Sequence, residues 1–178
     1  YTTLFANYPP LIGLLLERSL QNVEFKSVLY RLLANLATNT NLAHMLVCSS
    51  DFSEITKVAI LDNDLHLLRF CRNITCHRDN LLRFSLVNHQ ESLIETMLNS
   101  ADKSEHLVEC AAILTNLADI ETDWLKQYQK YSIDNFVVQF FKESRSKKSN
   151  DLALRYVLLF VGTTALQTEL SSYLIEHN

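Results

Sequence analysis

Residues 29–36 read LYRLLANL, and the same spacing returns at 67–74 (LLRFCRNI) and 110–117 (CAAILTNL). Each copy has an apolar residue, two more apolar residues three and four positions later, and then Asn followed by an aliphatic residue. A degraded fourth copy at 156–163 (YVLLFVGT) has Gly162 in the Asn position. The Asn positions are 38, 43 and 46 residues apart, which indicates an internal repeat built from two or three helices.

The composition favours packed helices. Gly and Pro number 2 each among 178 residues, where average usage would give roughly 20 together. So few turn-forming residues exclude a β-sandwich, a barrel or a collagen-like chain. Apolar residues make up 48% and charged residues 20%, so the chain is expected to fold around a core.

Apolar residues that recur with a period of 3.6 predict three helices per repeat, with the last one the longest. The long helices that carry the Asn motif are expected at 23–37, 65–76, 105–118 and 151–162. Pairs of shorter helices are expected at 42–47 and 52–60, at 81–87 and 91–98, and at 124–131 and 133–141.

Further local signals fix where helices start and stop. Helices are also expected at 11–20 and 167–176, and the polar segment 142–150 (KESRSKKSN) is expected to be a loop. Short polar residues that suit a helix N-terminus predict caps at Asn80, Asp123, Asp134 and Asp151.

The chain is expected to form one helical-repeat domain, 1–178, and to be a fragment of a longer protein. Three full repeats are expected, with a partial repeat before them and another after them. Their bounds are 11–37, about 38–76, 77–118 and 119–163, and 164–178.

Charge and cysteine content exclude several classes of function. Lys and Arg number 16 against 20 Asp and Glu, a net charge of −4, which argues against a general nucleic-acid binder. The apolar runs are far shorter than the roughly 20 residues that span a bilayer. The four cysteines form no Cys-x-x-Cys pair and are expected to be reduced thiols in an intracellular protein, cytoplasmic or nuclear.

No catalytic or cofactor motif is present in the sequence. With Gly13 and Gly162 as its only glycines, the chain has no glycine-rich phosphate loop, and the patterns of zinc proteases and serine hydrolases are absent as well. Cys71, Cys76 and His77 do not suggest a metal site, because residues five apart on a helix diverge by about 140°. We therefore expect no enzyme activity, cofactor or metal.

The junctions between units resemble the armadillo (ARM/HEAT-like) repeat family. The matching segments are RNIT at 72–75 followed by DNLL at 79–82, and LLANLA at 32–37 followed by Asn41. The resemblance covers about 20–165 and implies an all-α solenoid, a right-handed superhelix of three-helix repeats. The Gly that the family usually places between its first two helices is missing and Gly162 replaces the fourth Asn, so the chain resembles a divergent member.

This resemblance implies a binding groove. In the family, the long third helices line a concave groove, and the recurrent Asn hydrogen-bonds the main chain of an extended peptide. By resemblance, Asn35, Asn73 and Asn116 would form that ladder, because an amide both donates and accepts. The alternative is that each Asn only bonds the following turn of its own repeat.

The position four residues before each Asn lies on the same helix face. In nuclear-import adaptors it is typically Trp, whereas here it holds Arg31, Arg69 and Ala112, so a basic nuclear-localisation signal is not the expected ligand. Guanidinium groups bind carboxylates and phosphates, so we expect an acidic or phosphorylated segment. The alternative is that the arginines pair with neighbouring acids such as Glu24, Asp64 and Asp79 on a solvated face.

The sequence therefore predicts a non-catalytic scaffold or adaptor that binds an extended segment of another protein. The expected groove residues are Arg31, Asn35, His66, Arg69, Arg72, Asn73, His77 and Asn116. One alternative is self-assembly through apolar ends, around 11–16 and 166–175, which would make the protein a homo-oligomer. A remote alternative is a helical exchange factor or enzyme platform.

Overall fold

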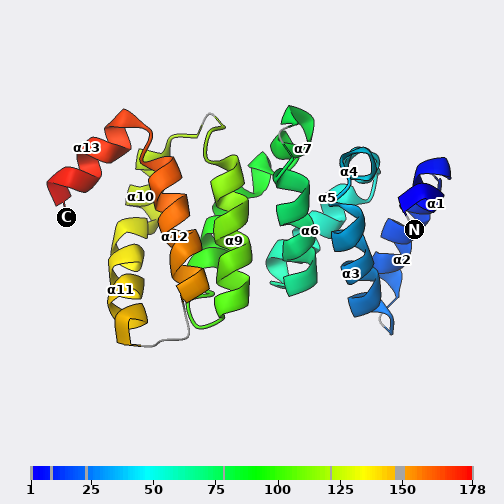
Figure 1. Cartoon of the computed structure of the whole chain (residues 1–178), viewed down its shortest axis with the longest axis horizontal. Coiled ribbons are helices and arrows are strands. Elements are labelled where there is room, and N and C mark those ends of the chain that lie inside the picture. The colour runs from blue at the N-terminus through cyan, green and yellow to red at the C-terminus, as the bar shows by residue number, and fades with distance from the viewer. Residues whose placement is uncertain are drawn as a thin grey trace. The chain divides into compact units, whose positions relative to one another are not determined.

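The computed structural model describes residues 2–8, 10–22, 24–77, 79–120, 122–146 and 151–177. These residues form thirteen α-helices and one 3-10 helix and contain no strand, which confirms the predicted all-α, armadillo-type class (Figure 1). The chain divides into two compact units, Tyr1–His89 and Gln90–Asn178. The prediction of a single domain with five repeat segments remains a prediction.

Unit 1, Tyr1–His89, contains the first two long helices of the repeat. The predicted long helices at 23–37 and 65–76 are present as α3, which begins three residues later and ends one residue earlier, and α6, which ends one residue earlier. The helix predicted at 81–87 is two short pieces. The elements are α1 (Thr2–Asn7), α2 (Pro10–Gln21), α3 (Lys26–Leu36), α4 (Thr40–Val47), α5 (Phe52–Leu61), α6 (Leu65–Thr75), α7 (Asn80–Phe84) and η1 (Val87–His89).

Unit 2, Gln90–Asn178, contains the other two long helices. Its elements are α8 (Gln90–Leu98), α9 (Ser104–Leu117), α10 (Trp124–Tyr131), α11 (Ile133–Ser146), α12 (Asp151–Thr164) and α13 (Thr168–His177). The predicted loop at 142–150 is wrong for 142–146, which belong to α11, and 147–150 lie outside the described residues. Helical pairs one turn apart extend α11 here, because Phe136 stacks on Phe140 and Gln139 donates to Glu143 at 3.0 Å.

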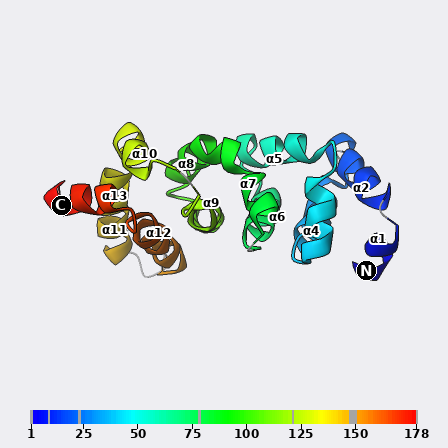
Figure 2. The same ribbon diagram turned by 90° about the horizontal axis from the view of Figure 1, so that it is seen from above.

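The long helices pack against each other within each unit, α3 against α6 and α9 against α12 (Figures 1 and 2). The repeated apolar positions explain this packing. In the second and third copies every one of these positions is buried, from Leu67 to Ile74 and from Cys110 to Leu117. In the fourth copy Phe160 is buried, but Leu159 is 54% exposed. Apolar burial at these positions is the main driving force for the fold.

The first helix of each three-helix repeat begins with the same kind of cap. The side chains of Asn39, Asp79 and Asp123 accept hydrogen bonds from backbone N–H groups three residues later, at 3.2, 3.2 and 2.9 Å. The predicted cap at Asp123 is confirmed, whereas the cap of α7 is Asp79 and not Asn80. Asp134 and Asp151 lie inside the first turns of α11 and α12, so their prediction as caps is wrong.

Aromatic packing forms the core around α10 and α12 in unit 2. Trp124 and Tyr128, both fully buried, lie with ring centroids 5.3 and 6.3 Å from that of Phe160. The Tyr128 hydroxyl and the Thr164 hydroxyl are hydrogen-bonded at 2.9 Å, and burial raises the pKa of Tyr128 to about 12. Cys71 and Cys110 are also buried, as expected of apolar helix positions. No helix in the described ranges has the length and hydropathy needed to cross a membrane.

Gly13 in α2 and Gly162 in α12 should tolerate a side chain. A Cβ atom at either position would meet no atom of the described structure within 4 Å. Because glycine costs roughly 0.5–1 kcal/mol relative to alanine inside a helix, we expect Gly13→Ala and Gly162→Ala each to raise the free energy of unfolding by about that amount. Urea unfolding followed by circular dichroism measures the change, and a decrease for either variant would contradict this placement.

Candidate protein-binding site

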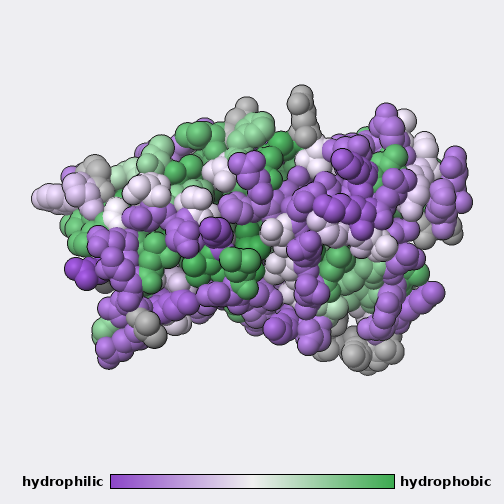
Figure 3. All heavy atoms as spheres, turned by 180° about the vertical axis from the view of Figure 1, so that it is seen from behind, coloured by the Kyte–Doolittle hydropathy of each residue, from purple (hydrophilic) through white to green (hydrophobic). Residues whose placement is uncertain are grey.

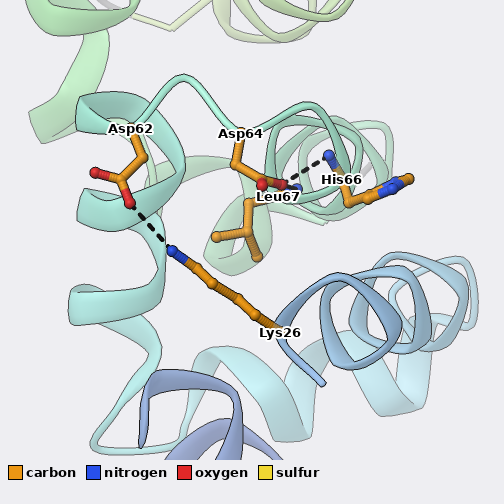
Figure 4. A network of polar contacts seen from close by, with 5 residues as sticks. All are labelled: Lys26, Asp62, Asp64, His66 and Leu67. Carbon is orange, nitrogen blue, oxygen red and sulfur yellow. Dashed lines mark hydrogen bonds and ion pairs between the residues drawn. The ribbon is translucent and has the colours of Figure 1, made fainter. Parts of the chain in front are cut away.

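Figure 4 shows how the start of α6 is held in unit 1. One carboxylate oxygen of Asp64 accepts hydrogen bonds from the backbone N–H groups of His66 and Leu67, at 2.9 and 3.1 Å, and so caps the helix. Lys26 of α3 pairs with Asp62 at the end of α5, at 3.3 Å. The imidazole of His66 points away from these contacts. The cap therefore fixes the first turn of α6 and leaves the His66 ring outside the network.

The acids that might have neutralised the arginines have other partners. Asp64 caps α6. Asp79 caps α7 with one oxygen and lies 3.4 Å from the His44 ring with the other. Arg69 and Arg72 have further contacts within the described ranges, so the pairing of the arginines with neighbouring acids stays an alternative.

Asn73 joins the two long helices of unit 1. Its Nδ2 donates to the backbone carbonyl of Ala34 in α3, at 2.8 Å. Its Oδ1 accepts from Nε and Nη2 of Arg72 over 3.4 and 3.3 Å. The Asn73 amide thus bonds the long helix of the preceding repeat and not the following turn of its own repeat. A peptide ligand would have to displace this hydrogen bond to use Asn73.

His77 makes a second link beside the first. Its Nε2 lies 2.8 Å from the carbonyl oxygen of Ala37, and its Nδ1 lies 3.2 Å from the Thr40 hydroxyl. A carbonyl oxygen only accepts, so Nε2 must carry the proton. The imidazole therefore connects the end of α6 to the turn between α3 and α4.

The carbonyls that these side chains reach need donors. The N–H of Thr38 bonds Asn35 and so leaves the Ala34 carbonyl without its helical partner, as the chain leaves α3. An unpaired, partly buried carbonyl costs roughly 1–3 kcal/mol. Asn73 and His77 remove this cost for α3 and at the same time fix the register of α6 beside it.

In unit 2, other side chains bond the backbone groups near the helix ends. Gln167, after α12, donates to the carbonyl of Thr122 at 2.7 Å and accepts from the N–H of Trp124 at 3.2 Å. The indole N–H of Trp124 donates to the carbonyl of Ala118 at 2.9 Å. Ala118 occupies the position in its copy that Ala37 occupies in the first copy. Sequence reasoning missed both links, although a polar side chain a few residues after each long helix was a signal.

The predicted groove residues have different surroundings. Seven of the eight lie in unit 1, and Asn116 lies on α9 of unit 2, half-buried. The side chains of Arg31 and Asn35 are exposed on α3, and within the described ranges neither makes a polar contact. The half-buried members on α6 or just after it are His66, Arg69, Arg72, Asn73 and His77.

The two units differ in net charge and in the residue that lies four positions before the Asn position of each repeat. Unit 1 contains eight Lys and Arg against seven Asp and Glu, and unit 2 contains eight against thirteen. In α12 of unit 2, the position four before Gly162 is Leu158, which is exposed beside Leu159. Arginines at this position, Arg31 and Arg69, are therefore a feature of unit 1.

Three-helix repeats whose long helices are joined by side chains that bond backbone carbonyls define an armadillo-type helical-repeat protein, a class of protein-binding adaptor. The family model described as kinesin-associated protein (KAP) matches residues 4–177. The chain belongs to this armadillo-repeat family. The match confirms the resemblance seen in the repeat junctions, and the family is of a non-catalytic scaffold type. No solved structure matches the chain.

If Asn73 and His77 are structural, their removal should destabilise unit 1. We expect Asn73→Ala and His77→Ala each to lower the free energy of unfolding by about 1 kcal/mol, because each leaves an α3 carbonyl without a donor. Asn35→Ala is the matched control and should change it by less than about 0.5 kcal/mol. Urea unfolding of the three variants measures this, and a larger loss for Asn35→Ala than for Asn73→Ala would reverse the assignment.

Proposed function

We propose that the chain is a non-catalytic adaptor and that unit 1 binds an acidic or phosphorylated, extended segment of a kinesin. The binding face consists of Arg31 and Asn35 on α3 and of His66, Arg69 and Arg72 on α6, and is called the basic face below. The family supports a protein partner and, by its description, a kinesin. The acidic character of the segment is our inference from the residues of the basic face.

The observation that carries the proposal is the arrangement of charge around the basic face. The carboxylates nearest to His66 and Arg69 in sequence have other partners, since Asp62 pairs with Lys26 and Asp64 caps the N-terminus of α6. The exposed Arg31 of α3 and the half-buried Arg69 of α6 occupy the same position in successive repeats. Since α3 and α6 pack side by side, successive repeats present guanidinium groups on neighbouring helices.

The chemistry of the basic face suits an extended acidic chain. A guanidinium forms two parallel hydrogen bonds to a carboxylate or phosphate, and the amide of Asn35 has a donor and an acceptor for a peptide main chain. Asn73 and His77 support the face by holding α6 against α3. Binding of this kind is screened by salt, so the affinity should fall steeply as ionic strength rises.

A second candidate function is self-association through exposed apolar side chains. Leu166 and Ile175 in unit 2 are each 82% exposed, which is unusual for large aliphatic residues. An increase of molar mass with concentration in light scattering would support a homo-oligomer.

A cytoplasmic location is also part of the proposal, because Cys48 and Cys76 are exposed free thiols, which persist in reducing compartments.

A charge-reversal variant tests the proposed ligand. We expect Arg31→Glu/Arg69→Glu to weaken binding of a fluorescent Glu-Ser repeat peptide at least about tenfold, as expected when two charge-assisted contacts become repulsive. The same variant should lose capture of kinesin polypeptides from lysate. Fluorescence polarisation and immunoblotting measure the two effects.

The matched control is Lys57→Glu/Arg155→Glu, which makes the same change in net charge at exposed side chains of α5 and α12. Circular dichroism should show that both variants remain folded. If the control weakens binding as much as the Arg31/Arg69 variant, the effect is one of net charge alone. If neither variant changes kinesin capture, the basic face is not the binding site.

A further inference from the structure

Four helices of unit 2 surround a pocket that the basic face does not include. Helices α10, α11, α12 and α13 enclose a volume of about 240 Å³. The pocket is lined by Tyr128, Asp134, Val137, Val138, Val161 and Leu174. Val138 is 38% exposed, so the pocket is accessible from the surface of α11. Figure 3 shows apolar side chains among polar ones on the face turned away from the viewer of Figure 1.

The size and the lining restrict what the pocket can hold. Sites for drug-sized ligands have volumes of roughly 300–1,000 Å³, so 240 Å³ suits a single long side chain. Val137, Val138, Val161 and Leu174 offer aliphatic surface, and the Tyr128 ring adds an aromatic one. The stem of the occupant must therefore be apolar.

Among the described residues that line the pocket, only Asp134 is charged. It lies in the first turn of α11, where the helix dipole stabilises a carboxylate. Its Oδ2 accepts a long hydrogen bond, 3.4 Å, from the Tyr173 hydroxyl. Its Oδ1 has no partner within the described ranges. Burial, together with this nearby carboxylate, raises the pKa of Tyr173. The carboxylate thus has capacity for a further donor.

A purely apolar occupant would be a poor fit. It would remove water from the Asp134 carboxylate without providing a counter-charge, which is costly. A cationic side chain with an aliphatic stem avoids this cost, because its stem covers the apolar wall while its head pairs with the acid. Unit 2 as a whole has thirteen Asp and Glu against eight Lys and Arg, which also favours a cationic partner.

We propose that this pocket binds an arginine side chain of a partner protein. The stem lies against Val137, Val138, Val161 and Leu174, and the guanidinium pairs with Asp134 beside the Tyr173 hydroxyl. The site is separate from the basic face: it belongs to the other unit and selects the opposite charge. The partner protein therefore presents an arginine to unit 2, whatever segment unit 1 binds.

The test uses the whole chain and a mimic of the arginine side chain. Methyl NMR of the Val- and Leu-labelled protein is recorded during titration with n-butylguanidinium and, separately, with its neutral counterpart n-butylurea. We expect saturable shifts at the methyl groups of Val137, Val138, Val161 and Leu174, with butylguanidinium binding about fivefold more tightly than butylurea. Asp134→Asn should remove this difference.

Two further variants keep the test decisive. Asp151→Asn, an exposed acid of the same unit that pairs with Arg155, is the matched control and should leave the preference unchanged. Val138→Trp should block the pocket and abolish the shifts while it leaves Asp134 in place. Equal binding of the two probes, shifts without saturation, or shifts that persist in both Asp134→Asn and Val138→Trp would overturn the proposal.

Discussion

The arrangement of unit 1 depends on two backbone carbonyls at the end of α3, those of Ala34 and Ala37. The chain turns at Thr38, so hydrogen bonds within α3 do not satisfy them. Asn73 in α6 and His77, two residues after the end of α6, supply the donors. Because both links must form together, α6 has one register against α3. That register sets α3, which carries Arg31 and Asn35, against α6, which carries His66 and Arg69.

Much of the fold follows from the sequence, because the apolar period determines the helices and the recurrent Asn marks the repeat. The structural role of Asn73 could not be predicted from the sequence. Its acceptor is a main-chain carbonyl 39 residues earlier, and a main-chain carbonyl has no sequence signature. The extension of α11 through 142–146 was missed because the polar composition outweighed the Gln139–Glu143 pair. The pocket at Asp134 requires four helices to converge, which no local pattern encodes.

The two units use one architecture for different surfaces. Both join a long helix to the preceding repeat through side chains that bond the backbone near a helix end, Asn73 and His77 in unit 1 and Gln167 in unit 2. The positions outside these links differ between the two units. Four residues before the Asn position, unit 1 has Arg31 and Arg69, whereas unit 2 has Ala112 and Leu158. This combination of fixed links and variable faces suits an adaptor that binds more than one segment of a partner.

The most direct test of this account is the tautomer of His77. Nitrogen-15 NMR of the imidazole at about pH 8, above the range in which histidine ordinarily titrates, distinguishes the protonated nitrogen from the other. The account predicts a proton on Nε2, with a coupling across the hydrogen bond to the Ala37 carbonyl carbon. A proton on Nδ1, or rapid exchange between the two tautomers without such a coupling, would contradict the link between α6 and α3.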